Sequence, residues 1–183
     1  MNGFGAWRQW LGSVFFLILS TDSLAEVYYS KDEAFELAFG SGASVEAVSL
    51  FLTDEQAANI ERTAKVKLDS RLYTFHRGMR GGQVLGYAAI ESHTVRTQPE
   101  VVMIVLDNAG QLVRIEVLAF HEPPEYKPPT RWFERLYRRP VQDLVIDHGV
   151  DAIAGATLSS RAALDGARKV LAIFKLAYKE ESN

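Results

Sequence analysis

The sequence predicts an α+β fold in which an antiparallel sheet is packed with helices. Residues 71–120 contain two pairs of strand-like runs, and turn residues separate the runs of each pair. Stretches with a helical period precede this region and follow it. The chain has 183 residues, of which 48% are hydrophobic and 23% are charged. This composition is ordinary for a globular protein, and the length fits one domain.

Two helices are expected before the sheet, over residues 30–40 and 53–68. Each begins with a hydroxyl residue that is followed three positions later by Glu or Gln, which is the spacing of a capping box. The two pairs are Ser30 with Glu33 and Thr53 with Gln56. The apolar run 45–52 lies between the helices, and its pattern fits either a helix or a strand.

Two hairpins are expected to form the sheet. The first joins RLYTFHRG (71–78) to VLGYAAIESHTV (84–95) through the glycine-containing turn MRGGQ. The second spans residues 100–120, where two apolar runs flank the turn sequence DNAG (107–110). These runs are rich in aromatic and β-branched residues, which favour strands.

The segment after the hairpins is expected to be irregular. Residues 121–129 contain four prolines, which exclude a helix or a central strand. A short helix is expected over 131–137, and VQDLVI (141–146) fits a strand or a buried run.

A final helix is expected to close the chain, from Ser159 or Ser160 to about Lys179. Its apolar positions recur with a helical period. They are Ala163, Ala167, Val170, Leu171, Phe174 and Ala177.

The first 25 residues differ in composition from the rest. Arg8 is the only charged side chain among the first 21 residues, the run 11–20 is almost entirely apolar, and the small-residue pattern SLA (23–25) follows. This is the layout of a secretory signal peptide, and the apolar run is short for a membrane-spanning helix. We expect residues 1–25 to be a signal peptide or an N-terminal anchor, and residues 26–183 to form one domain outside the cytoplasm.

Composition excludes several classes of function. The chain contains no cysteine, which rules out disulfides, Cys-ligated zinc and iron–sulfur clusters. Its four histidines include no His-x-x-x-His pair, so no metal site is expected. A net charge of −3 argues against general nucleic-acid binding.

The stretch DAIAGATLSS (151–160) combines small residues with hydroxyl residues at the expected start of the last helix. Ala154, Gly155 and Ala156 would let a ligand approach the backbone, and Thr157 is the only reactive group at the centre of the stretch. The start of a helix stabilises a bound phosphate. A plain strand-to-helix turn with serine caps is the alternative interpretation of the same residues.

DAIAGATLSS resembles the flavinylation motif of the FMN-binding domain family. That motif has Asp, two variable residues, Ser or Thr, Gly, Ala, Thr or Ser, a variable residue, and Ser or Thr. The matching positions are Asp151, Gly155, Ala156, Thr157 and Ser159. Ala154 stands where the family usually has Ser or Thr.

The resemblance extends over residues 85–178. The segment 101–126 looks like the family's central hairpin followed by a loop of the type His/Asn-Glu-Thr-Pro-Gly. His121 and Glu122 align with the first two residues of this loop, and prolines and Glu125 occupy the remaining positions. The segment YRRPVQDLVIDHGVDAIAGAT also resembles the family's approach to the attachment site.

The resemblance implies that the hydroxyl of Thr157 is esterified to the phosphate of FMN. The implied modifying enzyme is an exported flavin transferase of the ApbE type, which uses FAD and Mg²⁺. The implied cofactor-binding residues are Thr157, Ala156, Gly155, Ala154, Leu158, Ser159, Ser160, Asp151, His121 and Glu122. No catalytic residue of the chain's own is expected.

Several nearby side chains have two interpretations. Tyr126, Trp132 and Phe133 can stack on the flavin ring or pack in the core. Asp151 can cap the turn before the helix or help the transferase to recognise it. Arg161 can contact a phosphate or form a surface ion pair.

Three functions are compatible with these expectations. The first is an electron-transfer flavoprotein, in the periplasm or on the extracytoplasmic face of the inner membrane, that relays electrons between a membrane redox complex or cytochrome and an acceptor. The family includes such subunits in the Rnf and Na⁺-translocating NADH:quinone oxidoreductase complexes. The second is a small flavin-dependent reductase with a diffusible substrate. The third is a non-redox assembly protein on the same fold.

Overall fold

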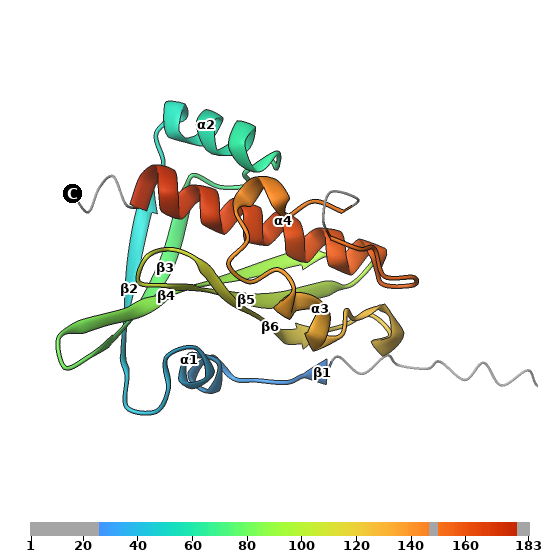
Figure 1. Cartoon of the computed structure of the whole chain (residues 1–183), viewed down its shortest axis with the longest axis horizontal. Coiled ribbons are helices and arrows are strands. Elements are labelled where there is room, and N and C mark those ends of the chain that lie inside the picture. The colour runs from blue at the N-terminus through green and yellow to red at the C-terminus, as the bar shows by residue number, and fades with distance from the viewer. Residues whose placement is uncertain (1–25, 147–149, 179–183) are drawn as a thin grey trace, which may run out of the picture.

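The computed structural model describes residues 26–146 and 150–178, and it confirms the α+β architecture (Figure 1). Six strands form one antiparallel sheet in the order β1-β6-β5-β4-β3-β2. The strands are β1 (Glu26–Val27), β2 (Ser44–Phe51), β3 (Leu72–Arg80), β4 (Gln83–Thr94), β5 (Pro99–Asp107) and β6 (Leu112–Phe120). The α-helices are α1 (Lys31–Phe39), α2 (Asp54–Ala64), α3 (Thr130–Glu134) and α4 (Thr157–Ile173).

Helices cover both faces of the sheet. In Figure 1, α2 and α4 lie on one side of the sheet and α1 lies on the other. The larger core joins α2 and α4 to the sheet through Ile60, Phe75, Ile104 and Phe174, among others. The smaller core lies under α1, and its residues are Ala34, Phe35, Phe39, Ala88, Met103, Val105 and Leu118. Residues of β5 alternate between the two cores, so this strand is buried on both faces.

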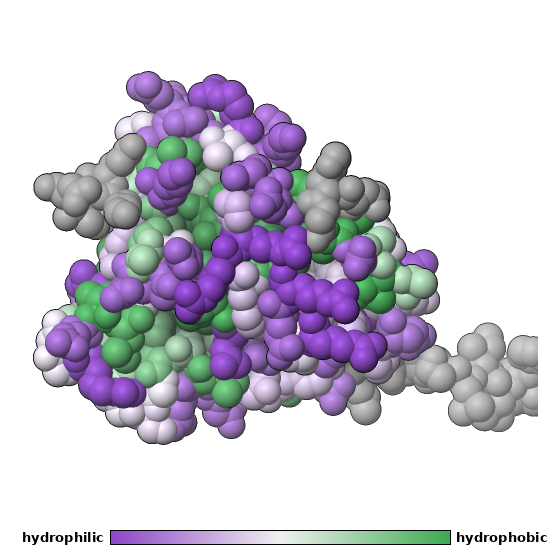
Figure 2. All heavy atoms as spheres, in the orientation of Figure 1, coloured by the Kyte–Doolittle hydropathy of each residue, from purple (hydrophilic) through white to green (hydrophobic). Residues whose placement is uncertain are grey.

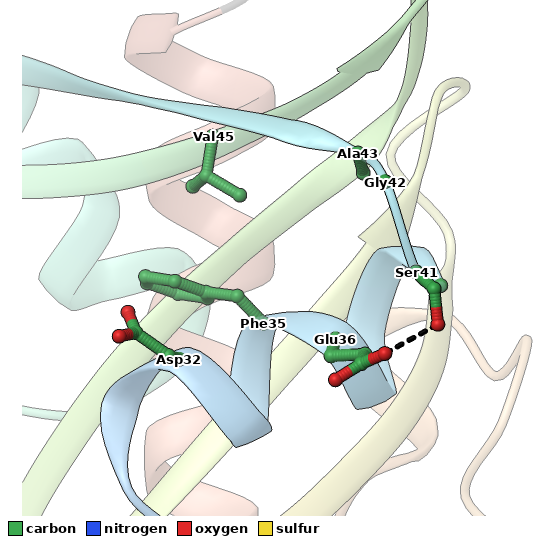
Figure 3. Close-up of a pocket in the computed structure, with 8 residues that line it drawn as sticks. Asp32, Phe35, Glu36, Ser41, Gly42, Ala43 and Val45 are labelled. Carbon is green, nitrogen blue, oxygen red and sulfur yellow. Dashed lines mark hydrogen bonds between the residues drawn. The ribbon is translucent and has the colours of Figure 1, made fainter.

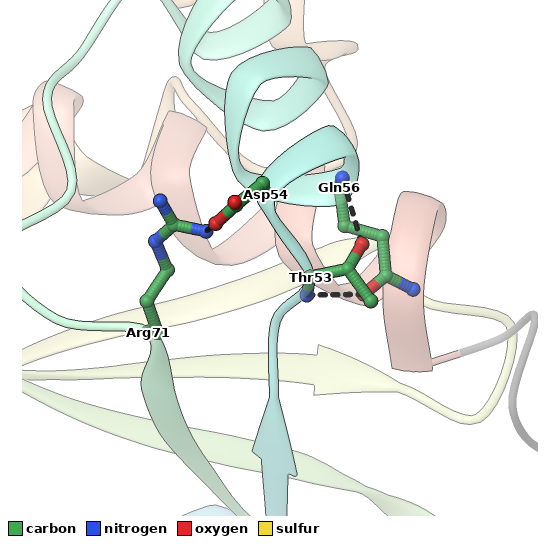
Figure 4. Close-up of polar contacts among 4 residues, drawn as sticks. All are labelled: Thr53, Asp54, Gln56 and Arg71. Carbon is green, nitrogen blue, oxygen red and sulfur yellow. Dashed lines mark hydrogen bonds and ion pairs between the residues drawn. The ribbon is translucent and has the colours of Figure 1, made fainter.

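The helices before the sheet begin where the sequence predicts. Ser30 and Thr53 are the N-caps of α1 and α2, and both capping boxes are formed. Figure 4 shows the second of these, in which Thr53 exchanges hydrogen bonds with Gln56 beside the ion pair of Arg71 with Asp54. The ambiguous run 45–52 forms β2.

The end of α2 differs from the expected helix 53–68. The helix ends at Ala64, and Lys65 adopts a left-handed conformation with φ 55°. Glu61 explains the early stop, because its carboxylate accepts the backbone N–H of Leu68 and pairs with Lys67. These contacts turn the chain back against the helix.

Both predicted hairpins are present, but the sheet is open at one place. Strands β3 and β4 pair from their turn only as far as His76 and Ala88. Beyond that point β3 pairs with β2 and β4 pairs with β5, so the two hairpins diverge. A hollow of about 310 Å³ lies there and is lined by residues that include Tyr73, Glu91 and Lys169. Polar side chains therefore occupy the place where backbone hydrogen bonds between β3 and β4 would otherwise continue.

Two segments after the sheet differ from their predictions. Of the two alternatives for residues 141–146, the strand is not formed. Val141–Asp143 form a 3₁₀ turn after Pro140, and Leu144 then enters the core. Helix α4 starts at Thr157, two residues earlier than expected, and a π-helical turn (Phe174–Tyr178) follows it. All six predicted apolar positions of this helix are buried.

The surface of the described residues is of mixed polarity. Figure 2 shows hydrophilic side chains over the centre of the face seen in Figure 1, with apolar side chains toward its left end. No helix within residues 26–146 and 150–178 is long and apolar enough to cross a membrane. The predicted signal peptide and Lys179 lie outside the described residues.

Candidate functional site

The predicted acceptor, Thr157, lies at the start of α4. Thr157 is the first residue of the helix and Ala156 is its N-cap, with no side-chain hydrogen bond to the helix end. The first N–H groups of an α-helix have no acceptor within the helix. In α1 and α2 a side chain caps the N-terminal end. The N-terminal end of α4 has free backbone donors and no capping side chain.

The hydroxyl groups of this first turn donate to carbonyl groups of residues that come earlier in the sequence. Thr157 donates to the carbonyl oxygen of Ile153 at 3.1 Å, and Ser160 donates to that of Ala156 at 2.8 Å. Ser159 donates to the carbonyl oxygen of Tyr126 at 2.6 Å. The serine caps of the alternative interpretation are therefore not formed, since these hydroxyls donate to carbonyl groups instead of accepting from N–H groups.

A tight turn delivers the chain into α4. The N–H of Ala156 donates to the carbonyl of Ile153 at 3.1 Å, and Gly155 has φ +85°. A positive φ at the third position of such a turn favours glycine. Ala154, Gly155 and Leu158 are exposed, and Thr157 is half-buried.

The structure brings the proline-rich loop against this turn. A 3₁₀ turn (Pro124–Tyr126) contacts α4, Ser159 bonds to Tyr126, and a Cβ at Gly155 would lie 3.8 Å from the carbonyl oxygen of Glu125. Two segments about 30 residues apart in the sequence therefore form one site.

His121 and Glu122 face a different part of the structure. Glu122 is buried, and its Oε1 accepts the backbone N–H groups of Arg96, Thr97 and Gln98 at 2.7–3.1 Å. The bond from Thr97 is the main reason that the pKa of Glu122 lies below its usual value. His121 is within hydrogen-bonding distance of the Pro99 carbonyl through Nδ1. In the described contacts both residues fasten the turn between β4 and β5, and a contact with FMN stays a prediction.

The other nearby side chains have mainly packing roles. Trp132 and Phe133 are buried in the larger core, and the Trp132 ring nitrogen donates to the carbonyl of Asp151 at 2.9 Å. The carboxylate of Asp151 pairs with Arg135 at 3.4 Å, where both side chains are largely exposed. Tyr126 lies under the guanidinium of Arg96, 4.7 Å from ring centroid to Cζ. Asp151 thus positions the approach to α4 through its backbone and does not cap the helix.

Sequence reasoning missed Glu100. This residue is fully buried on β5, and neither of its carboxylate oxygens has a hydrogen-bond partner. Burial raises its pKa to about 7, against the opposing influence of Lys127. The signal was present in PEVVMIVLD, because Glu100 occupies the same alternate positions as Val102 and Ile104, which face the core.

The hollow beside α1 has the wrong charge for a phosphate. It measures about 390 Å³, and Figure 3 shows Asp32 and Glu36 at its edge, with Phe35 and Val45 on its walls. Two carboxylates disfavour a bound anion. The acceptor turn offers backbone donors and the positive end of a helix dipole instead.

The fold and this turn define a class of protein: an α+β domain that presents a threonine hydroxyl at an uncapped helix start suited to a phosphate. Comparison with protein families then identifies the segment, since residues 97–172 match the model of the FMN-binding domain. This match confirms the resemblance to the FMN-binding domain family over that segment. The match begins at the turn held by Glu122 and ends within α4. No curated protein and no solved structure matches the chain.

The residues present fit a phosphate-bearing cofactor. The first turn of α4 has donors without a capping side chain, and Thr157 is only half-buried. Arg161 lies one helical turn after Thr157, on the same side of α4, and its side chain is exposed. Its guanidinium can reach a group attached to Thr157 and add a second positive charge.

Proposed function

We propose that this protein is an exported electron-transfer flavoprotein that carries FMN as a phosphoester on Thr157. The observation that carries the proposal is the uncapped start of α4, where Thr157 is the first helical residue within the segment that matches the FMN-binding domain. Bound FMN supplies the redox chemistry, while the protein holds it and tunes its surroundings.

The chemistry of attachment needs a separate enzyme and a flavin donor. An ApbE-type flavin transferase with Mg²⁺ would transfer FMN from FAD to Thr157. The Thr157 oxygen would form a bond to the FMN phosphorus of FAD. The bond from that phosphorus to the bridging oxygen of the pyrophosphate would break, and AMP would leave. The hydroxyl proton would pass to the transferase or to solvent. The phosphate would then lie beside the N–H groups of the first turn and within reach of Arg161.

Export is proposed from the signal-peptide layout of residues 1–25. A membrane redox complex or a cytochrome would be the electron partner, and a covalent bond would keep the cofactor on a protein outside the cytoplasm.

Intact mass tests the attachment. The chain is co-expressed with an ApbE-type transferase and exported, alongside Thr157→Ala and Thr130→Ala. Thr130 is the matched control, because it is an exposed threonine and the first residue of α3. We expect a gain of FMN less water in the wild type and in Thr130→Ala, and no gain in Thr157→Ala.

The other outcomes point to the other functions. An unmodified wild type, in cells where a known substrate of the transferase is labelled, would contradict the covalent link and favour a non-redox assembly protein. A labelled protein that turns over a diffusible substrate with a nicotinamide donor would favour a reductase. A mature mass that begins at Glu26 would support export.

A further inference from the structure

Strand β2 forms one edge of the sheet, and within the described residues no strand lies on its outer side. It is the last strand in the sheet order and pairs with β3 alone (Figure 1). The opposite edge is covered, because β1 pairs with the end of β6, α3 packs against β6, and the N–H of Arg138 donates to the carbonyl of Leu112. Of the two edges, that of β2 is therefore the one open to a further strand.

Alternate residues of β2 direct their backbone groups away from β3. The N–H of Leu52 donates to the carbonyl of Arg71 at 2.8 Å, and these residues continue the register of β2 with β3. Pairs in an antiparallel ladder alternate between hydrogen-bonded and non-hydrogen-bonded ones. The even-numbered residues of β2 are therefore bonded to β3, and the odd-numbered residues point their N–H and C=O groups outward. These residues are Val45, Ala47, Ser49 and Phe51, and all four are exposed.

Strand β2 lacks the features that usually keep an exposed edge from pairing. Its sequence, SVEAVSLF, contains no Lys, Arg or Pro, and its register with β3 has no bulge. Its one charged residue, Glu46, pairs with Arg77 of β3 at 2.7 Å. A strand laid along this edge would therefore meet no unbalanced charge.

Large apolar side chains are exposed along the same edge. Phe51 is 72% exposed, and Leu72, its neighbour on β3, is 57% exposed. Val45, near the other end of β2, is 37% exposed. Burial of these side chains against a partner would be favourable.

A second copy of β2 fits this edge in one antiparallel register. Opposed residues share a face of the sheet, so outward-facing residues must lie opposite outward-facing residues. With a two-fold axis at Val48, Phe51 lies opposite Val45 of the second copy, and Ala47 lies opposite Ser49. Every outward-facing residue then has a hydrogen-bonding partner, and apolar side chains meet at both ends. An axis at Ala47 or Ser49 would instead place Val45 opposite a polar residue.

We propose that β2 is a dimerisation edge, along which two copies of the chain join their sheets in antiparallel fashion about a two-fold axis at Val48. Both copies use the same edge and the other edge is covered, so the assembly closes at two copies. The interface lies outside the segment that matches the FMN-binding domain, and the proposal does not depend on the proposed function.

Sedimentation equilibrium of the purified chain over a range of concentrations measures the assembly. We expect a monomer–dimer equilibrium for the wild type. Ala47→Lys should raise the dissociation constant by at least about tenfold, because a lysine on an edge strand opposes pairing. The matched control is Leu37→Lys, since Leu37 is exposed on α1, and it should associate like the wild type. Circular dichroism verifies that both variants fold.

A disulfide locates the axis, because the chain contains no cysteine of its own. Val48→Cys should form a linked dimer under mild oxidation, since on the axis its Cβ would face that of the second copy in a non-hydrogen-bonded pair. Ala47→Cys is the control, because it would lie opposite Ser49 and should link poorly.

Three results would overturn the proposal. The first is a wild type that stays monomeric at every concentration. The second is a dimer that a folded Ala47→Lys leaves as tight as the wild type. The third is a dimer in which Val48→Cys links no more readily than Ala47→Cys.

Discussion

Two glutamates on the same face of the sheet have opposite surroundings. Glu91 of β4 is buried between Lys169, at 2.5 Å, and the hydroxyl of Tyr73. Glu100 of β5 is equally buried but has no partner. The first carboxylate stabilises the place where β3 and β4 diverge, and it lies outside the family match. The second lies inside the match, at a strand position that alternates like those of the core residues Val102 and Ile104.

The two glutamates show that a buried carboxyl can be satisfied by partners within the protein or left without them. A buried ion pair is satisfied by contacts within the protein and needs no ligand. A buried carboxyl without hydrogen bonds destabilises the folded protein when it is charged, so burial favours its neutral form.

Removal of the lysine should have the largest effect on stability. Lys169→Met leaves Glu91 buried and without its counter-charge, which should lower the free energy of unfolding by about 3–5 kcal/mol. The control is Lys175→Met, because Lys175 is exposed, and a change within about 0.5 kcal/mol is expected there. Urea denaturation of the three proteins at pH 7 measures both effects. A loss for Lys169→Met as small as that of the control would show that the pair does not stabilise the divergence.

Neutralisation of Glu100 should have the opposite sign and should depend on pH. The pKa of Glu100 is raised from 4.5 to about 7 in the folded protein. The stability from this group is therefore present below pH 4.5 and is lost as the pH rises through about 7, because the unfolded chain ionises first. Glu100→Gln has no such loss. Its free energy of unfolding relative to the wild type should rise by about 3 kcal/mol between pH 4.5 and 8.

Chemical denaturation at several pH values between 4.5 and 8 tests this difference. The matched control is Glu55→Gln, since the Glu55 side chain is exposed on α2. A difference between Glu100→Gln and the wild type that stays flat over this range would contradict the raised pKa.

Much of the fold could be predicted because its signals are local. Capping boxes at Ser30 and Thr53 act over four residues, and the apolar stripe of α4 repeats every turn. Turn residues and strand-like runs likewise defined both hairpins. The end of α2 was misjudged because Glu61 turns the chain back through contacts that no periodic pattern contains.

The candidate site was only partly predictable. The sequence indicated Thr157 and the proline-rich loop, but a serine near a helix start can cap N–H groups or donate to carbonyls. Ser159 and Ser160 do the latter, so α4 begins two residues earlier than expected. The missing partners of Glu100 depend on what surrounds it in three dimensions, which alternation alone does not reveal.

Glu122 is a third buried carboxylate, and its substitution should have the smallest effect on the free energy of unfolding. Its Oε1 accepts three backbone N–H groups of the turn between β4 and β5. Glu122→Gln keeps an acceptor oxygen but loses the charge, so the free energy of unfolding should fall by about 1–2 kcal/mol at neutral pH. The matched control is Glu125→Gln, because Glu125 is exposed in the same loop.

The pH dependence of this variant should be the reverse of that of Glu100→Gln. The pKa of Glu122 is lowered, chiefly by the N–H of Thr97, so its stability is present above the unfolded pKa and is lost as the pH falls through the folded one. The deficit of Glu122→Gln should therefore shrink below about pH 4. A deficit that persists unchanged in acid would show that shape, and not the charged hydrogen bonds, accounts for the role of Glu122. Opposite pH slopes for the two variants would establish that Glu122 fastens the loop as an anion and that Glu100 is buried as a neutral acid.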